Sequence, residues 1–315
     1  MMPSDPILAK ASAENFPVAL RALPDRYRRH LMAVYVFART VDDAGDLADP
    51  ADRPRLLAEL EADVHRLYAT LGPAARPEGP EPASPGSDDH DPGAPEPGPP
   101  AARLITATPD WPRLPAVRGL AAAVTECAIP MRPFTDLIAA NKQDQVVSRY
   151  DSFDQLLDYC TLSANPVGQL VLYVFGAYSP ERAALSDAIC TGLQITEHLQ
   201  DVAEDYRNGR VYLPAADMRR YQCAEPDLTG HTASGSLRRL IAFEAGRAHA
   251  LLDAGAPLIA SLAGPARLAV AGYVAGGRAA LAALAAADYD ILAATPRPRT
   301  SRTVAELARA YLRAG

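Results

Sequence analysis

The chain contains 315 residues, of which 49% are hydrophobic and 22% charged, and its net charge is −7. This apolar content supports a packed core and excludes a wholly disordered chain, whereas the acidic balance argues against a nucleic-acid partner, which selects a basic face. Because no apolar run reaches the roughly 18 residues of a membrane span and no secretory signal begins the sequence, we expect a cytoplasmic protein with no transmembrane segment.

Apolar residues recur at three- and four-residue spacing along most of the sequence, and the alternating pattern of strands is absent. Such spacing gathers apolar side chains on one face of a helix, so we predict an all-α fold. Pro166 is expected to kink or divide the segment from 152 to 177, because its backbone nitrogen cannot donate a hydrogen bond. In chain order, the pattern predicts helices at 26–47, 51–71, 115–127, 133–145, 152–163, 166–177, 181–208, 234–262, 265–287 and 302–313.

Proline is concentrated in one segment, since ten of the 29 prolines lie between Pro73 and Pro100. The apolar side chains there are alanines, which cannot bury enough surface to offset the entropy lost on ordering the chain. A polyproline ligand for a partner is the alternative interpretation. We therefore predict one helical domain with a disordered insertion, divided as 1–72 for the N-terminal helices, 73–102 for the insertion, 103–300 for the rest of the domain and 301–315 for a C-terminal helix or tail.

The first predicted helix carries four polar side chains at four-three-four spacing: Tyr35, Arg39, Asp42 and Asp46. This spacing places them on one stripe of the helix. Two aspartates four residues apart repel each other and usually mark a solvated face. Apolar residues flank this stripe, and a second such stripe elsewhere in the chain makes a solvated face a weaker explanation for the two together.

The predicted helix at 181–208 repeats the pattern. Its polar stripe comprises Gln194, His198, Asp201 and Asp205, and beside it lie Glu197 and Glu204. Carboxylates on facing helices hold divalent cations in the cores of helical bundles. Mg²⁺ bound by one or two carboxylates keeps coordination positions that phosphate oxygens fill. The two stripes together therefore predict a Mg²⁺ site for a phosphate-bearing ligand.

Arginines near both stripes strengthen this prediction. Arg39, Arg207 and Arg210 offer fork-shaped donors that match phosphate oxygens. Combined with apolar helices, they predict a ligand with a diphosphate head and a long hydrocarbon body. The competing hypothesis is a non-catalytic interaction protein, in which the acidic faces and the proline-rich segment bind partners.

At these motifs the sequence resembles the squalene and phytoene synthase family. The resemblance is carried by Asp42-Asp43-x-x-Asp46, by Asp201-x-x-x-Asp205 and by the segment GRVYLP at 209–214, and it extends from about Glu14 to Arg299. It implies a single-domain isoprenoid-synthase helical bundle with a central apolar cavity. It further implies a synthase that processes prenyl diphosphates with Mg²⁺.

Finer motifs resemble one subgroup, the HpnC-type hydroxysqualene synthases of bacterial hopanoid pathways. These motifs are ENFPVA at 14–19, FART at 37–40, the segment 159–168 and LQDVA at 199–203. The resemblance implies conversion of presqualene diphosphate and water to hydroxysqualene and diphosphate, beside a sister enzyme that makes the substrate and a flavin enzyme that reduces the product. Head-to-head condensation to squalene, presqualene diphosphate or phytoene is the alternative. Glu197 and Gln200 weaken that alternative, because condensing relatives usually have asparagine and arginine there.

The resemblance also implies roles for individual residues. The expected metal ligands are Asp42, Asp46, Asp201, Asp205 and Glu197. Arg39 and Arg210 are expected to stabilise the diphosphate, and Tyr159 to lie near the reacting carbons. The remaining predicted substrate contacts are Tyr35 and Gln194, which orient the diphosphate, Tyr212, which closes its site, and Phe16, Val167, Gly168 and Leu170, which wall the hydrocarbon tunnel.

Ordinary packing competes with several of these roles. A core tyrosine with a satisfied hydroxyl explains Tyr159 equally well, and helix packing equally explains the apolar tunnel residues. His198 is better explained as a partner of Glu197 or a core histidine than as a proton carrier. Because the implied product, hydroxysqualene, is hydrophobic, we also expect peripheral contact with a membrane surface.

Overall fold

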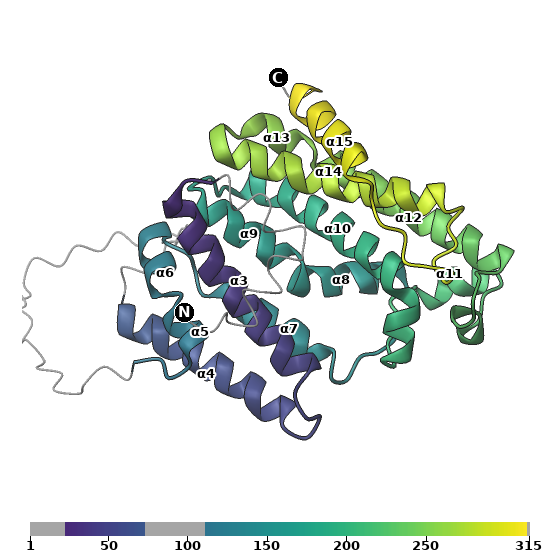
Figure 1. The fold of residues 1–315 in the computed structure, drawn as a ribbon. Coiled ribbons are helices and arrows are strands. Elements are labelled where there is room, and N and C mark those ends of the chain that lie inside the picture. The colour runs from purple at the N-terminus through teal and green to yellow at the C-terminus, as the bar shows by residue number, and fades with distance from the viewer. Residues whose placement is uncertain (1–22, 73–110, 314–315) are drawn as a thin grey trace, which may run out of the picture.

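The computed structural model describes residues 23–72 and 111–313, and this part of the chain is helical throughout (Figure 1). A single bridge between Arg149 and Val211 is the only β pairing within these ranges. The helices are α3 (Asp25–Asp46), α4 (Arg53–Leu71), α5 (Pro115–Arg118), α6 (Ala121–Cys127), α7 (Arg132–Gln143), α8 (Phe153–Ser163), α9 (Asn165–Val174), α10 (Pro180–Arg207), α11 (Ala215–Arg220), the 3₁₀ turn η2 (Glu225–Leu228), α12 (Gly235–Gly255), α13 (Pro257–Ser261), α14 (Gly264–Ala286) and α15 (Thr300–Arg313).

The predicted helices are confirmed, with their ends shifted by a few residues. Pro166 lies in the first turn of α9 and, as expected, separates it from α8. Two predicted helices are each divided in the structure. The segment 115–127 breaks at Gly119 into α5 and α6, and the segment 234–262 breaks before Pro257, which begins α13. Helix α11 and the turn η2 were missed because both are too short to show a helical period.

Two predictions lie outside the described residues. The insertion predicted at 73–102 falls within the undescribed residues 73–110, and Phe16, expected at the tunnel, falls within the undescribed residues 1–22.

The core consists of two apolar clusters that meet at α9. One cluster joins α3, α4, α6 and α7 through fully buried side chains such as Phe37 and Phe134, whose rings meet edge to face at 5.2 Å. The other joins α8, α10, α12 and α14. Helix α9 contributes Leu170 to the first cluster and Leu172 to the second. In Figure 1, α3, α4 and α7 form one side of the bundle and α10, α12 and α14 the other.

Small residues allow α10 to pack closely against α12 and α14. A Cβ atom on Gly255 of α12 would lie 2.6 Å from the carbonyl oxygen of Leu185. A Cβ atom on Gly277 of α14 would lie 2.7 Å from a methyl group of Leu193. Real Cβ atoms do not approach this closely. Glycine at both positions therefore allows the close spacing between α10, which carries the second polar stripe, and its neighbours α12 and α14.

Helix α14 is long and apolar enough to cross a membrane by length and composition. In the structure, 56% of its most apolar stretch is buried, against α10, α12, α13 and α15. Its composition is therefore that of a central core helix.

Candidate active site

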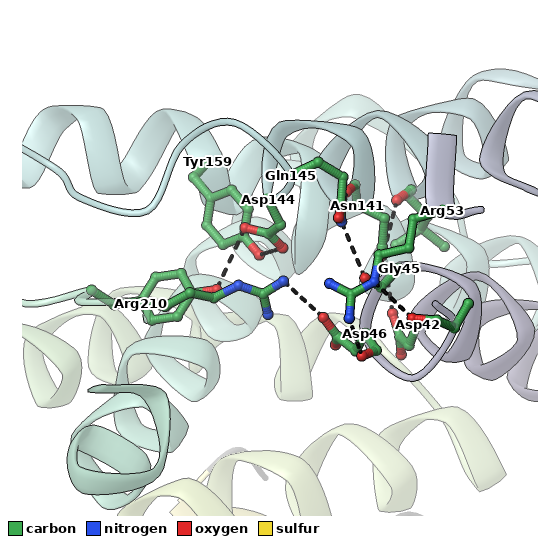
Figure 2. Close-up of polar contacts among 12 residues, drawn as sticks. Asp42, Gly45, Asp46, Arg53, Asn141, Asp144, Gln145, Tyr159 and Arg210 are labelled. Carbon is green, nitrogen blue, oxygen red and sulfur yellow. Dashed lines mark hydrogen bonds and ion pairs between the residues drawn. The ribbon is translucent and has the colours of Figure 1, made fainter. Parts of the chain in front are cut away.

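The first aspartate motif lies at the C-terminal end of α3, where it faces α7. The side-chain amide of Asn141 donates a hydrogen bond to Asp42 at 3.3 Å, and Gln145 donates to the carbonyl oxygen of Gly45 at 3.2 Å (Figure 2). A Cβ atom on Gly45 would lie 2.2 Å from Oδ1 of Asn141. Glycine between the two aspartates therefore leaves the room that Asn141 needs to reach Asp42.

An ion pair links the first motif to the segment that follows the second. Nη2 of Arg210 lies 2.8 Å from Oδ1 of Asp46, although these residues come from opposite halves of the chain (Figure 2). The side chain of Arg210 is mostly buried, whereas that of Asp46 is half exposed. Arg210 therefore contacts the first aspartate motif from the segment that follows the second, and its role toward a diphosphate head stays a prediction.

A short pairing of two loops holds Arg210 in this position. The backbone N–H of Val211 donates to the carbonyl of Ser148 at 2.9 Å, and that of Ala215 donates to Tyr150 at the same distance. The guanidinium of Arg149 donates to the carbonyl of Gly209 at 2.6 Å and makes a two-pronged contact with Glu225 at 2.6 and 2.9 Å. Arg149 therefore fastens the residue that precedes Arg210 to the neighbouring loop.

A carboxylate and two tyrosines form the interior of the site. The hydroxyl of Tyr159 donates to Oδ2 of Asp144 at 2.7 Å, and that of Tyr212 lies 3.4 Å from Oδ1 of the same side chain. Burial raises the pKa of both tyrosines and of Asp144. The two phenols therefore stay protonated and remain hydrogen-bond donors, oriented by one buried carboxyl group.

The second polar stripe reaches this cluster through His198. Its ring stacks on that of Tyr212, with 3.7 Å between centroids and 12° between planes. Gln194 lies 3.2 Å from Nε2 of the imidazole, and Asp205 lies 3.7 Å from Nδ1. The contacts run along α10 as the predicted stripe requires. His198 is thus packed between Tyr212 and the stripe, which agrees with the expected core histidine, and the contacts of its ring nitrogens are with Gln194 and Asp205.

The carboxylates fit a hard divalent cation by their chemistry. Burial, with Asn141 and Arg39 opposing it, raises the pKa of Asp42 to about 6. Burial and the neighbouring Glu197, Asp205 and Glu204 raise the pKa of Asp201 to about 6. Oδ2 of Asp205 is buried and, within residues 23–72 and 111–313, has no hydrogen-bond partner. Crowded, partly desolvated carboxylate oxygens are stabilised by a bound cation.

The side chains do not enclose a metal ion by themselves. Among the described residues, no group of three or more histidine, cysteine, aspartate or glutamate side chains is placed to hold one ion. This arrangement is compatible with Mg²⁺, which is commonly held by one or two carboxylates together with substrate phosphates. Glu197 is exposed on α10, and its role as a ligand stays a prediction.

An apolar cavity of about 160 Å³ lies between α9, α10, α13 and α14. Val167 and Gly168 line it, as predicted, together with Cys190, Val270 and Tyr273 of the facing helices. Gly168 also sets the helix spacing, because a Cβ atom there would lie 2.4 Å from Oγ of Ser186. Leu170, expected beside them, is instead fully buried in the α3–α7 cluster and does not line this cavity, because α9 turns it to the other side.

Each predicted polar residue in the described ranges thus has a definite place. Asp144 contacts both Tyr159 and Tyr212, and Asp46 pairs with Arg210. Gln194, Asp201 and Asp205 share one stripe of α10. On α3, Tyr35 and Arg39 are half-buried on the stripe of Asp42, and Nε of Arg39 lies 3.7 Å from Asp43. Their direct roles toward a ligand remain predictions.

Sequence reasoning missed the residues that α7 and its following loop contribute. Asn141, Asp144 and Gln145 stand three and four positions apart at the end of α7, and Arg149 follows them. This polar spacing directly after the apolar stretch at 137–140 was a usable signal, because residues so spaced share a face of a helix.

Comparisons with known proteins identify relatives of this chain. A family model described as squalene/phytoene synthase matches residues 9–304. The hydroxysqualene synthase of Zymomonas mobilis is 33% identical over 242 residues, which span 76% of this chain and 67% of that protein. The hydroxysqualene synthase of Rhodopseudomonas palustris is 32% identical over 252 residues, which span 79% and 71%.

A crystal structure of squalene synthase HpnC from Alicyclobacillus acidocaldarius has a similar fold, with a TM-score of 0.71. It is 34% identical in sequence, and the match covers 89% of this chain and 91% of that one. Residues 9–304, which the family model matches, include both aspartate motifs, the loop of Arg210 and the helices around the apolar cavity. The chain therefore belongs to the squalene/phytoene synthase family, whose members are synthases that process prenyl diphosphates.

Proposed function

We propose that this chain converts presqualene diphosphate and water into hydroxysqualene and diphosphate, with Mg²⁺ as its metal. The ion pair between Arg210 and Asp46 supports the proposal, because it joins the first aspartate motif to the segment that directly follows the second. The similarity to two hydroxysqualene synthases supports this choice of reaction within the family.

In the proposed binding mode, the diphosphate lies between α3 and the loop of Arg210. Arg210 and Arg39 neutralise the charge that grows on the diphosphate as the carbon–oxygen bond breaks and the bonding electrons leave with oxygen. Asp42, Asp46, Asp201 and Asp205 would hold Mg²⁺ beside the same oxygens. When bound there, Mg²⁺ would supply Lewis-acid chemistry to the leaving group.

The hydrocarbon part of the substrate extends toward the apolar cavity. The carbocation left by ionisation rearranges, and one water oxygen bonds to it and loses one proton, so substrate and water give the alcohol and diphosphate. In the proposed step Tyr159 orients that water by accepting a hydrogen bond from it, because its own proton is donated to Asp144 at 2.7 Å. The aromatic faces of Tyr159 and Tyr212 are suited to stabilise the cation.

One contact favours a single diphosphate head over the two that condensation requires. Gln200 stands where condensing relatives usually have an arginine, and its amide donates to the carbonyl of Pro296 at 2.6 Å. This position therefore carries no positive charge for a second diphosphate, and its side chain is hydrogen-bonded to the segment between α14 and α15.

The test is turnover by the purified chain with Mg²⁺, given either presqualene diphosphate or farnesyl diphosphate. We expect hydroxysqualene from the first and no product from the second. Efficient turnover of farnesyl diphosphate by this chain alone would overturn the proposal in favour of condensation.

The metal mechanism is tested separately by Asp201→Asn. We expect at least a hundredfold loss of turnover and a weaker dependence on added Mg²⁺. Glu181→Gln is the matched control, because Glu181 is exposed at the start of the same helix. Unchanged turnover in Asp201→Asn would remove Mg²⁺ from the second motif.

A further inference from the structure

Helix α15 packs along α14 at the periphery of the bundle (Figure 1). Leu307 and Ala310 turn toward the larger core cluster. Arg267 of α14 lies over the ring of Tyr311 at 4.5 Å and donates to its carbonyl oxygen at 2.9 Å. These contacts hold α15 to the body of the protein by one side.

The apolar surface of α15 extends well beyond the side that α14 covers. Val304, Ala308, Tyr311 and Leu312 recur at the spacing of one helical stripe and are all exposed. Val304 is 60% exposed and Leu312 is 77% exposed. Three of the eight large, exposed hydrophobic side chains in the described part of the chain lie in this stripe. Single exposed hydrophobic residues are common on protein surfaces, but a group of them on one helix marks an interaction surface.

Arginines border the stripe. Residues 297–312 contain four arginines and one glutamate, a net charge of +3 in a chain whose total is −7. Nε of Arg302 lies 3.3 Å from Oε1 of Glu306, and Nη1 of Arg309 lies 2.6 Å from the same atom. Glu306 thus holds both arginines beside the apolar stripe while cancelling one of their charges, and both side chains remain about half exposed.

We propose that α15 docks this protein on an anionic lipid bilayer. Val304, Tyr311 and Leu312 enter the boundary between headgroups and acyl chains, and Arg302 and Arg309 meet the lipid phosphates. An amphipathic helix with an exposed apolar stripe and a basic border lies in this way in the plane of a membrane interface.

Charge favours a bilayer over a second copy of the chain. A symmetric dimer through α15 would bring the same basic segment of both copies together, and like charges across an interface are unfavourable. An anionic surface instead neutralises these arginines and attracts this region of an otherwise acidic protein.

The test is flotation of the full chain with vesicles in the absence of substrate. The vesicles are equal mixtures of phosphatidylcholine and phosphatidylglycerol, compared with phosphatidylcholine alone. We expect flotation with the anionic vesicles, at least tenfold weaker binding to the neutral ones, and release by raised salt. The double variant Val304→Ser with Leu312→Ser should lower binding to anionic vesicles about tenfold.

Two control variants match these changes elsewhere on the surface. Val146→Ser alters an 84% exposed valine in the segment between α7 and α8, and should float like the parent chain. Arg302→Gln with Arg309→Gln should remove most of the preference for anionic lipid. Arg55→Gln, whose arginine pairs with Glu59 across one helical turn at 2.8 Å, should leave it unchanged.

Three outcomes overturn the proposal: no flotation with either vesicle, flotation that the serine variant leaves intact, or a dimer in light scattering that this variant dissolves. The binding test uses no substrate, so its result is independent of the reaction proposed above. Turnover in detergent should be equal for the parent chain and the serine variant.

Discussion

The contact between Gly45 and Asn141 makes a specific prediction for Gly45→Ala. The new Cβ atom would lie 2.2 Å from Oδ1, 3.1 Å from Cγ and 3.3 Å from Cβ of Asn141. The asparagine side chain is flexible at its end, so it can move aside without disrupting the fold. In doing so it gives up its hydrogen bond to Asp42.

The magnitude follows from two opposed effects. Loss of a hydrogen bond to a carboxylate costs about 1.5–3 kcal/mol, whereas replacing glycine by alanine in a helix gains about 0.5–1 kcal/mol. The net loss of unfolding free energy is about 1 kcal/mol, which lowers Tm by about 3 °C in a domain of this size. Activity should suffer more, by about 10- to 100-fold, because Asn141 orients an expected metal ligand.

The assay pairs thermal unfolding with the rate of diphosphate release. Gly246→Ala is the matched control, since nothing lies within 4 Å of a Cβ atom at that exposed position of α12. It should gain about 0.5–1 kcal/mol of stability and keep full activity. If Gly45→Ala matches this control in both measurements, Asn141 has no part in positioning Asp42.

Three further predictions concern other contacts. Arg149→Gln should raise the KM for the diphosphate substrate about tenfold and leave Tm nearly unchanged, because the substitution loosens the loop of Arg210. The control is Arg132→Gln, which should keep the parent KM because the Arg132 side chain is 88% exposed. Asp63→Ala should lower the unfolding free energy in urea by about 2–4 kcal/mol, because the buried carboxylate accepts the backbone N–H groups of Arg113 and Leu114 at 2.8 and 2.6 Å; a loss below about 0.5 kcal/mol would contradict this anchoring role. Burial raises the pKa of Glu244 to about 7 from 4.5, so the folded state holds this proton more tightly and stability falls as pH rises across that interval. The Tm of Glu244→Gln minus that of the parent chain should therefore be larger at pH 7.5 than at pH 5. An equal difference at both pH values would refute the assignment.

Much of the fold was predictable because helical periodicity is local. The stripes of Asp42 and Asp201 follow from spacing alone, since 3.6 residues per turn convert sequence intervals into faces. Leu170 shows the limit of such reasoning. Its neighbours Val167 and Gly168 do line the cavity, but a buried helix is apolar on every side, so the pattern could not tell which side of α9 faces the cavity.

The sequence by itself determined the helical class, the two acidic stripes and the family resemblance, because each rests on residues close together along the chain. Only the tertiary structure decided which side chains meet. Asn141 reaches Asp42 across 99 positions, and Asp144 accepts from Tyr212 across 68. Such pairs depend on how whole helices pack, and packing is set by the shapes of many side chains together rather than by any local spacing.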